Sequence, residues 1–239
     1  MKVDICLPVY NEDLIFNDNA SQLLTFLRNS DLKVDWRVIF IVNGSSLDFQ
    51  RMVQEFVDQN AIDTSVFFVK KAGKGRAIKT YFDFSQADVL AYMDIDLAVD
   101  LNNLFSLLAP VLSGELDLCL GSRMLASSRV KRSYLRGISS QAYIAVSRLL
   151  LKHDVSDLQC GFKAIDAKSW RQLSPKIQNN DFFFDTELIY FARKVNLKIK
   201  EIPVDWSENR YHLRCSKTNL WRDSVLFMWE IWKLWRRRQ

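Results

Sequence analysis

The chain has 239 residues, enough for one large domain or two small ones. Hydrophobic residues make up 49% of it and charged residues 26%, which is the balance of a folded globular protein and excludes a disordered one. The formal net charge of +5 is concentrated at residues 123–136 and 236–238, which indicates a local anionic partner such as phosphate or a membrane surface. No aromatic residues are interleaved as in a basic nucleic-acid-binding stripe, so no nucleic acid is expected.

The first half of the chain alternates predicted strands and helices. Strands are predicted at 2–9, 36–42, 65–70, 89–93 and 116–121, and helices at 17–29, 47–59, 75–84 and 101–112. This order predicts an α/β fold in which helices cover both faces of a mostly parallel sheet. Ligands bind such sheets at the carboxyl ends of the strands, so the polar sets at 10–12, 43–45, 94–96 and 121–123 should converge.

The second half is predicted to contain longer helices. We expect a helix at 133–152, a loop at 160–163, a helix near 185–195, a strand near 198–204 and a last helix at 220–235. No repeat or low-complexity linker interrupts the sequence. We therefore expect one catalytic domain over residues 1–218, followed by an amphipathic helix over residues 219–239.

The most informative motif is the pair Asp94 and Asp96, which directly follows the apolar run at 89–93. Strand side chains alternate between faces, so both carboxylates should point the same way. Two such groups repel each other unless a cation lies between them. A hard divalent ion that also grips a diphosphate meets this need, whereas the alternative is a solvated loop.

Two further polar turns suggest a nucleotide. Tyr10 offers a flat face for a base and Glu12 offers an acceptor, although a capped strand-to-helix turn explains both equally well. Lys74 lies between two glycines before a predicted helix, where backbone and ammonium groups can meet an anion. An ordinary glycine-rich turn is the alternative there.

Taken together, eight motifs resemble the family 2 glycosyltransferases of the GT-A fold, and most closely the polyprenyl- and dolichyl-phosphate hexose synthases. They occur in order as PVYNE (8–12), VNGS (42–45), GKG (73–75), DID (94–96), GSR (121–123), QCGFK (159–163), FDTE (184–187) and EIPV (201–204). The resemblance covers residues 2–217, nearly the whole chain.

The resemblance implies a role for three groups of residues. The nucleotide sugar would be bound by residues from several strand ends and a late basic motif: Pro8, Tyr10, Glu12, Asn43, Lys74, Asp94 and Lys217. The metal, Mg²⁺ or Mn²⁺, would be held by Asp94 and Asp96. The acceptor phosphate would meet Arg123, Arg136 and Ser140.

The sequence departs from the family pattern at two places. Val42 and Asn43 stand where the family usually has two acidic residues, although Asn43 can both donate to and accept from a base edge. Ala98 stands where one subgroup has a polar third metal ligand, for which Asp100 is a substitute.

These features predict an inverting, metal-dependent glycosyltransferase that moves a hexose from a UDP- or GDP-sugar to a polyprenyl or dolichyl phosphate. One alternative acceptor is a saccharide hydroxyl, as in surface polysaccharide or lipooligosaccharide assembly. That acceptor requires a general base, for which Asp185 and Glu187 are candidates unless they merely cap a helix. A further alternative is a non-catalytic membrane scaffold that binds nucleotide sugars.

The last predicted helix carries a stripe of apolar and aromatic residues: Trp221, Val225, Met228, Trp229, Trp232 and Trp235. Such a helix, followed by arginines, is typical of a membrane interface, and the alternative is a helix packed on the domain.

The cysteines are too scattered to form a metal-binding pair, and the chain opens on a strand rather than a leader. We therefore expect a peripheral protein on the cytoplasmic face of a membrane, attached directly or through a membrane-protein partner.

Overall fold

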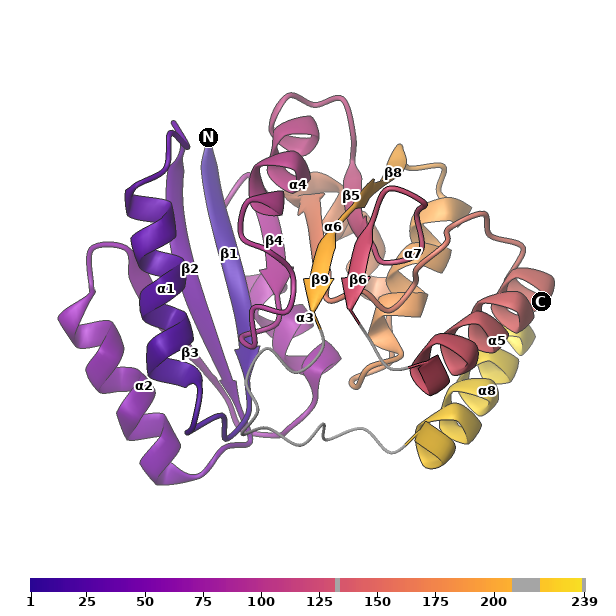
Figure 1. The fold of residues 1–239 in the computed structure, drawn as a ribbon, viewed down its shortest axis with the longest axis horizontal. Helices are drawn as coiled ribbons and strands as arrows, with labels where there is room; N and C mark the ends of the chain where they lie inside the picture. The colour runs from indigo at the N-terminus through magenta and orange to yellow at the C-terminus, as the bar shows by residue number, and fades with distance from the viewer. Residues whose placement is uncertain (132–133, 208–219, 238–239) are drawn as a thin grey trace.

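The computed structural model describes residues 1–131, 134–207 and 220–237, with side chains at 1–131, 143–207 and 226–237 (Figure 1). Within these residues, seven strands form one sheet in the order β3-β2-β1-β4-β7-β5-β8. Their bounds are β1 (Lys2–Val9), β2 (Asp35–Asn43), β3 (Thr64–Val69), β4 (Val89–Met93), β5 (Leu118–Ser122), β7 (Phe162–Asp166) and β8 (Ile199–Pro203). β7 runs antiparallel to both neighbours, and the other pairs are parallel. A small parallel pair joins β6 (Arg129–Lys131) to β9 (Asp205–Ser207).

Helices cover both faces of the main sheet. One face packs against α1 (Phe16–Arg28), α2 (Leu47–Gln59) and α4 (Asn103–Leu112). The other packs against α3 (Lys74–Phe84), α6 (Ala167–Leu173), which the short helix η1 (Ser174–Lys176) follows, and α7 (Phe184–Lys194). Alternation along β1 sends Val3, Ile5 and Leu7 into the first core and Cys6 into the second. The predicted α/β class with a mostly parallel sheet is confirmed.

The main difference from the predicted elements is β7, which we expected to be a loop around residues 160–163. It is a central strand that separates β4 from β5. Lys163, the second residue of β7, pairs with Tyr92 of β4 and is completely buried. A lysine within a short apolar run looks like the end of a strand, because lysine is almost never buried unless it is paired.

The C-terminal helix α8 (Leu220–Arg236) lies beside α5 (Tyr134–Leu151), as Figure 1 shows. Its buried residues Ile231 and Leu234 join a small core with Leu151 and with Tyr190 of α7. The outer face of α8 exposes large apolar side chains: Leu226, Met228, Trp229, Trp232 and Trp235. Among the described helices, none has an apolar stretch long enough to cross a bilayer. The division of the chain at residue 218 stays a prediction.

Candidate functional site

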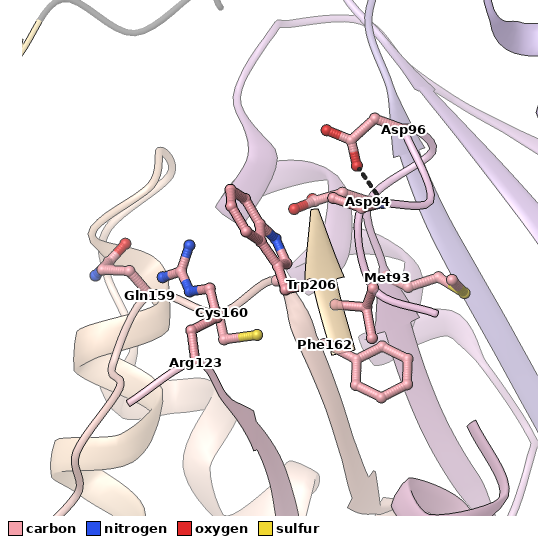
Figure 2. A pocket seen from close by; sticks show the side chains of 11 residues that line it. Met93, Asp94, Asp96, Arg123, Gln159, Cys160, Phe162 and Trp206 are labelled. Carbon is pink, nitrogen blue, oxygen red and sulfur yellow. Dashed lines mark hydrogen bonds between the residues drawn. The ribbon is translucent and has the colours of Figure 1, made fainter. Parts of the chain in front are cut away.

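Asp94 and Asp96 occupy a tight turn directly after β4. The amide of Leu97 donates to the Asp94 carbonyl (3.2 Å), and Leu97 adopts a left-handed backbone conformation with φ of 47°. Asp96 Oδ1 accepts from the Ala98 amide at 3.1 Å. Both carboxylates line the same cleft (Figure 2), as predicted, but a turn rather than strand alternation brings them there.

The cleft gathers segments that are far apart in the sequence. It is lined by residues that end or follow β4, follow β5, precede or begin β7, or belong to β9: Met93, Asp94, Asp96, Ala98, Val99, Arg123, Gln159, Cys160, Gly161, Phe162 and Trp206. In Figure 2 the aspartates lie on one side and Arg123 on the other, with Trp206 between them in this view. The cleft has a volume of 90 Å³, which equals that of about three waters and is enough for a phosphate group or a metal ion.

Lys74, the first residue of α3, forms an ion pair with the first of these aspartates. Its Nζ lies 2.7 Å from Asp94 Oδ1, and the Asp94 side chain remains 47% exposed. Burial alone would lower the pKa of Lys74, but Asp94, Asp185 and Asp96 together raise it above its ordinary value. Lys74 therefore keeps its positive charge at neutral pH.

Gly161 allows this ion pair to form. A Cβ atom at this position would collide with the Asp94 carboxylate and come within 2.6 Å of Lys74 Nζ. The backbone leading into β7 therefore passes directly beside the two charged groups. Only glycine leaves them in place.

The glycine-rich turn before α3 is anchored by Asn43 at the end of β2. Asn43 Oδ1 accepts from the Gly73 amide (3.0 Å), and Nδ2 donates to the Val9 carbonyl (2.9 Å). The side chain is 4% exposed. Backbone groups therefore engage the Asn43 amide, which joins the ends of β1 and β2 to the turn that carries Lys74, and its contact with a base stays a prediction.

Arg123, which follows β5, is fixed by an aspartate that the sequence analysis missed. Asp157 accepts from Nε (2.7 Å) and Nη2 (2.9 Å) of Arg123 and is 2% exposed. Burial alone would raise the pKa of Asp157, but the Arg123 guanidinium holds it below its ordinary value. The guanidinium also lies over the Trp206 ring, 5.6 Å from its centroid. The need of a buried arginine for a counter-charge was the only signal that pointed to Asp157.

The candidate general bases Asp185 and Glu187 are engaged in the structure instead. Asp185 Oδ1 accepts from the Tyr92 hydroxyl and from Lys163 Nζ (2.6 Å). Glu187 Oε2 accepts from the amides of Gln178 and Asn179, each at 2.7 Å. These carboxylates are 1% and 3% exposed. Neither group lines the cleft, so the structure gives no support to their predicted role as general bases, which stays a prediction.

The remaining predicted residues are placed as follows. Pro8 is the second-last residue of β1 and is half-buried. Tyr10 and Glu12 follow that strand at the same sheet edge, and Tyr10 is 42% exposed. Arg136 and Ser140 belong to α5, in the part whose side chains lie outside the described residues. Lys217 lies outside the described residues altogether.

The two cleft aspartates fit a divalent ion, but the proposed third ligand does not join them. Asp100 Oδ1 accepts from the amide and side chain of Asn102 (2.9 and 2.8 Å) and does not line the cleft. The described residues contain no group of three acidic, histidine or cysteine side chains placed to hold a metal. Mg²⁺ is commonly bound by one or two carboxylates together with substrate phosphates and waters, which is the set that Asp94 and Asp96 allow.

Comparison with known proteins agrees with this architecture. The glycosyl transferase family 2 model matches residues 4–173. The glycosyltransferase AglD of Haloferax volcanii is 30% identical over 98% of this chain, which spans 37% of that relative. The dolichyl-phosphate beta-glucosyltransferase of Dictyostelium discoideum is 28% identical over 86% of this chain, which covers 66% of that protein.

Solved structures show the same fold. Glucosyl-3-phosphoglycerate synthase from Mycobacterium tuberculosis, crystallised with Mn²⁺, uridine diphosphate and phosphoglyceric acid, superimposes with a TM-score of 0.66 at 14% identity, covering 96% of this chain and 78% of that one. The predicted GT-A fold is thereby confirmed. The chain belongs to glycosyl transferase family 2.

Proposed function

We propose that this chain transfers a hexose, with inversion, from a nucleotide sugar to a polyprenyl phosphate such as dolichyl phosphate. One observation carries the proposal: Asp94 and Asp96 face the same cleft as Arg123. A carboxylate pair suits a cation on the donor diphosphate, and an arginine suits an acceptor phosphate. The cleft thus presents one group for each of the two anions that the reaction brings together.

The donor side must stabilise a departing nucleoside diphosphate. Mg²⁺ or Mn²⁺ held by Asp94 and Asp96 would neutralise part of the charge on that leaving group. Lys74 adds a positive charge that is already in place, because Asp94 keeps it protonated. Tyr10 and Glu12, at the same sheet edge, are proposed to contact the nucleoside.

The acceptor side needs an oriented nucleophile rather than a base. A phosphate monoester is mostly dianionic at neutral pH, because its second pKa is about 6. Asp157 occupies the Nε and Nη2 sides of Arg123 and so fixes the plane of a guanidinium that lines the cleft. Direct attack by the phosphate oxygen inverts the anomeric carbon. A saccharide hydroxyl acceptor is disfavoured, because its two candidate bases, Asp185 and Glu187, are buried and engaged.

The relatives support the substrates that we propose, and the exposed face of α8 supports a location at a membrane surface. The Dictyostelium relative is named for dolichyl phosphate and glucose, and the mycobacterial structure holds Mn²⁺ and uridine diphosphate. A lipid phosphate is presented at a membrane surface, and α8 exposes Trp229, Trp232 and Trp235 on its outer face. Tryptophan favours the membrane interface, so we propose that this face rests on the cytoplasmic leaflet.

The test is a transfer assay with a panel of nucleotide sugars, Mn²⁺, and either polyprenyl phosphate in anionic vesicles or a saccharide acceptor. We expect product with polyprenyl phosphate. Asp96→Asn should lower kcat/KM by at least about 100-fold while the circular dichroism spectrum is unchanged. The matched control is Asp58→Asn, at an exposed position near the end of α2.

Three results would contradict parts of the proposal. Product with the saccharide alone would overturn the lipid-phosphate acceptor. Nucleotide binding without turnover for any pair would favour the scaffold interpretation. Full activity of Asp96→Asn would show that Asp96 does not bind the catalytic metal.

A further inference from the structure

The last described residue, Arg237, connects the end of α8 to the body of the protein. Its Nη1 lies 2.6 Å from Glu187 Oε1, and its Nη2 donates to the Lys176 carbonyl at 2.8 Å. The guanidinium also lies over the ring of Phe191, 5.5 Å from the centroid. Arg237 is 32% exposed, whereas Glu187 is nearly completely buried. The C-terminal helix is therefore attached to α7 by a charged contact in addition to its apolar face.

Glu187 links Arg237 to the loop at residues 177–181. While Oε1 meets Arg237, Oε2 accepts from two consecutive backbone amides, those of Gln178 and Asn179, each at 2.7 Å. A carboxylate that accepts charge-assisted bonds on both oxygens has a fixed orientation. The position of Arg237 therefore bears directly on the position of the 177–181 loop.

The same loop holds the first turn of α3. The Asn180 carbonyl accepts from the Arg76 amide (2.8 Å), and Lys79 Nζ donates to the Ile177 carbonyl (2.7 Å). The contact is too close for side chains: a Cβ on Gly73 would lie 2.5 Å from the Asn180 carbonyl oxygen, and one on Gly75 would lie 2.8 Å from that of Asp181. Between these glycines lies Lys74, whose Nζ meets Asp94.

We propose that Arg237 is a positioning residue for the donor site, acting through Glu187 and the 177–181 loop on the first turn of α3. The packing of α8 on α7 thereby determines the geometry of the ion pair between Lys74 and Asp94. The inference rests on the proposed function in one respect only, namely that the Lys74–Asp94 pair binds the donor diphosphate. It assigns a use to Glu187 that requires no contact with substrate.

The contacts form an uninterrupted path in which each step is a hydrogen bond or a backbone packing contact. Such a path allows coupling between Arg237 and the first turn of α3, and a measured change in that turn on substitution of Arg237 demonstrates it. When Arg237 is lost, the buried Glu187 loses its cationic partner and the carboxylate can rotate away from the loop amides. The loop and the first turn of α3 should then open more often, and donor binding should weaken because fewer molecules hold Lys74 in place.

The experiment compares Arg237→Ala with Lys194→Ala in the full chain. Lys194 is an exposed cation in the last turn of α7, on the same surface, and makes no contact with Glu187. Amide hydrogen exchange is measured in peptides covering residues 174–183 and 72–80, and uridine diphosphate binding with Mn²⁺ is measured by calorimetry. Arg237→Ala should speed exchange in both peptides and raise the Kd about threefold to thirtyfold, and Lys194→Ala should change neither. Arg237→Lys, which keeps the charge, should restore part of the protection.

Each outcome bears on the inference. Faster exchange at 174–183 without a change at 72–80 would overturn it, because the loop would then be uncoupled from α3. Unchanged exchange in both peptides would overturn it as well. A wild-type chain that binds no nucleotide would instead contradict the proposed function, while the exchange pattern would still decide whether Arg237 acts on the first turn of α3.

Discussion

Two acidic pairs with the same spacing reach opposite environments in this protein. Asp94 and Asp96 follow β4 and line an open cleft, where the Asp94 side chain is 47% exposed. Asp185 and Glu187 lie in the first turn of α7, where they are 1% and 3% exposed. The first pair lines a cleft that a ligand can enter, whereas the second pair is enclosed by the protein.

The difference comes from the backbone on which each pair lies. A tight turn after β4 presents Asp94 and Asp96 to the same cleft. On a helix, residues two positions apart point about 200° away from each other, because each residue turns by about 100°. Asp185 therefore reaches Lys163 on the sheet, and Glu187 reaches the loop and Arg237 on the other side. Acidic spacing alone thus does not identify a catalytic pair.

The largest expected effect tests whether the helical pair is structural. Asp185→Ala leaves the ammonium of Lys163 buried without its carboxylate, which should lower the free energy of unfolding by about 3–5 kcal/mol. Urea unfolding followed by circular dichroism at pH 7 measures it, with exposed Asp58→Ala as the control. A variant as stable as the control but without transferase activity would restore Asp185 as a catalytic group.

A smaller effect is expected at the cleft pair, where function should suffer more than stability. Gly161→Ala pushes the flexible ends of Asp94 and Lys74 apart, which should reduce kcat/KM by roughly 10-fold to 100-fold. The matched variant is Gly114→Ala, which has open space around its Cβ but a φ of 73°. That variant should lose about 1 kcal/mol of stability and keep its activity. Equal activity of the two variants would show that the geometry of the Lys74–Asp94 pair does not matter.

The smallest expected effect is on the pH dependence of stability, and it concerns the Tyr92 hydroxyl, which donates a hydrogen bond to Asp185. Burial and the neighbouring Asp185 raise the pKa of Tyr92 well above its ordinary value of 10.0. Above pH 10 the unfolded chain therefore releases this proton while the folded chain keeps it, so stability falls as pH rises. Tyr92→Phe should remove a loss of about 1 kcal/mol between pH 10 and 11, with the slope approaching about 1.4 kcal/mol per pH unit only above pH 11. Parallel stability curves for the two proteins would contradict the raised pKa.

Much of the fold follows from local patterns. α2 and β4 begin and end where periodicity and turn residues predict, and the alternation of strands with helices predicts the parallel half of the sheet. The strand β7 could not be predicted from local patterns. It is inserted antiparallel between β4 and β5, which are far from it in the chain, and it buries Lys163 against Asp185. The burial of a charged side chain depends on a partner that no local window contains.

The candidate site divides in the same way. Asp94, Asp96 and Arg123 are predicted because each directly follows an apolar strand, and such strand ends meet at one edge of a parallel sheet. Trp206, which lines the cleft, and Asp157, which holds Arg123 there, are missed because they lie on segments without a comparable signal. The structural role of Asn43 is not predicted, because its amide suits a base and a backbone equally well, and only the fold places Gly73 and Val9 beside it.

By itself, the sequence determined the class of fold, the family resemblance and the strand ends that carry the cleft, because these depend on short-range periodicity and on the order of motifs. The tertiary structure alone decided which acidic residues line the cleft and which are buried. Asp185 and Glu187 have the composition of a catalytic pair, but a buried lysine, two backbone amides and an arginine from the last helix engage them. A carboxylate's role depends on what surrounds it, and for Asp185 and Glu187 those surroundings come from residues up to 93 positions away.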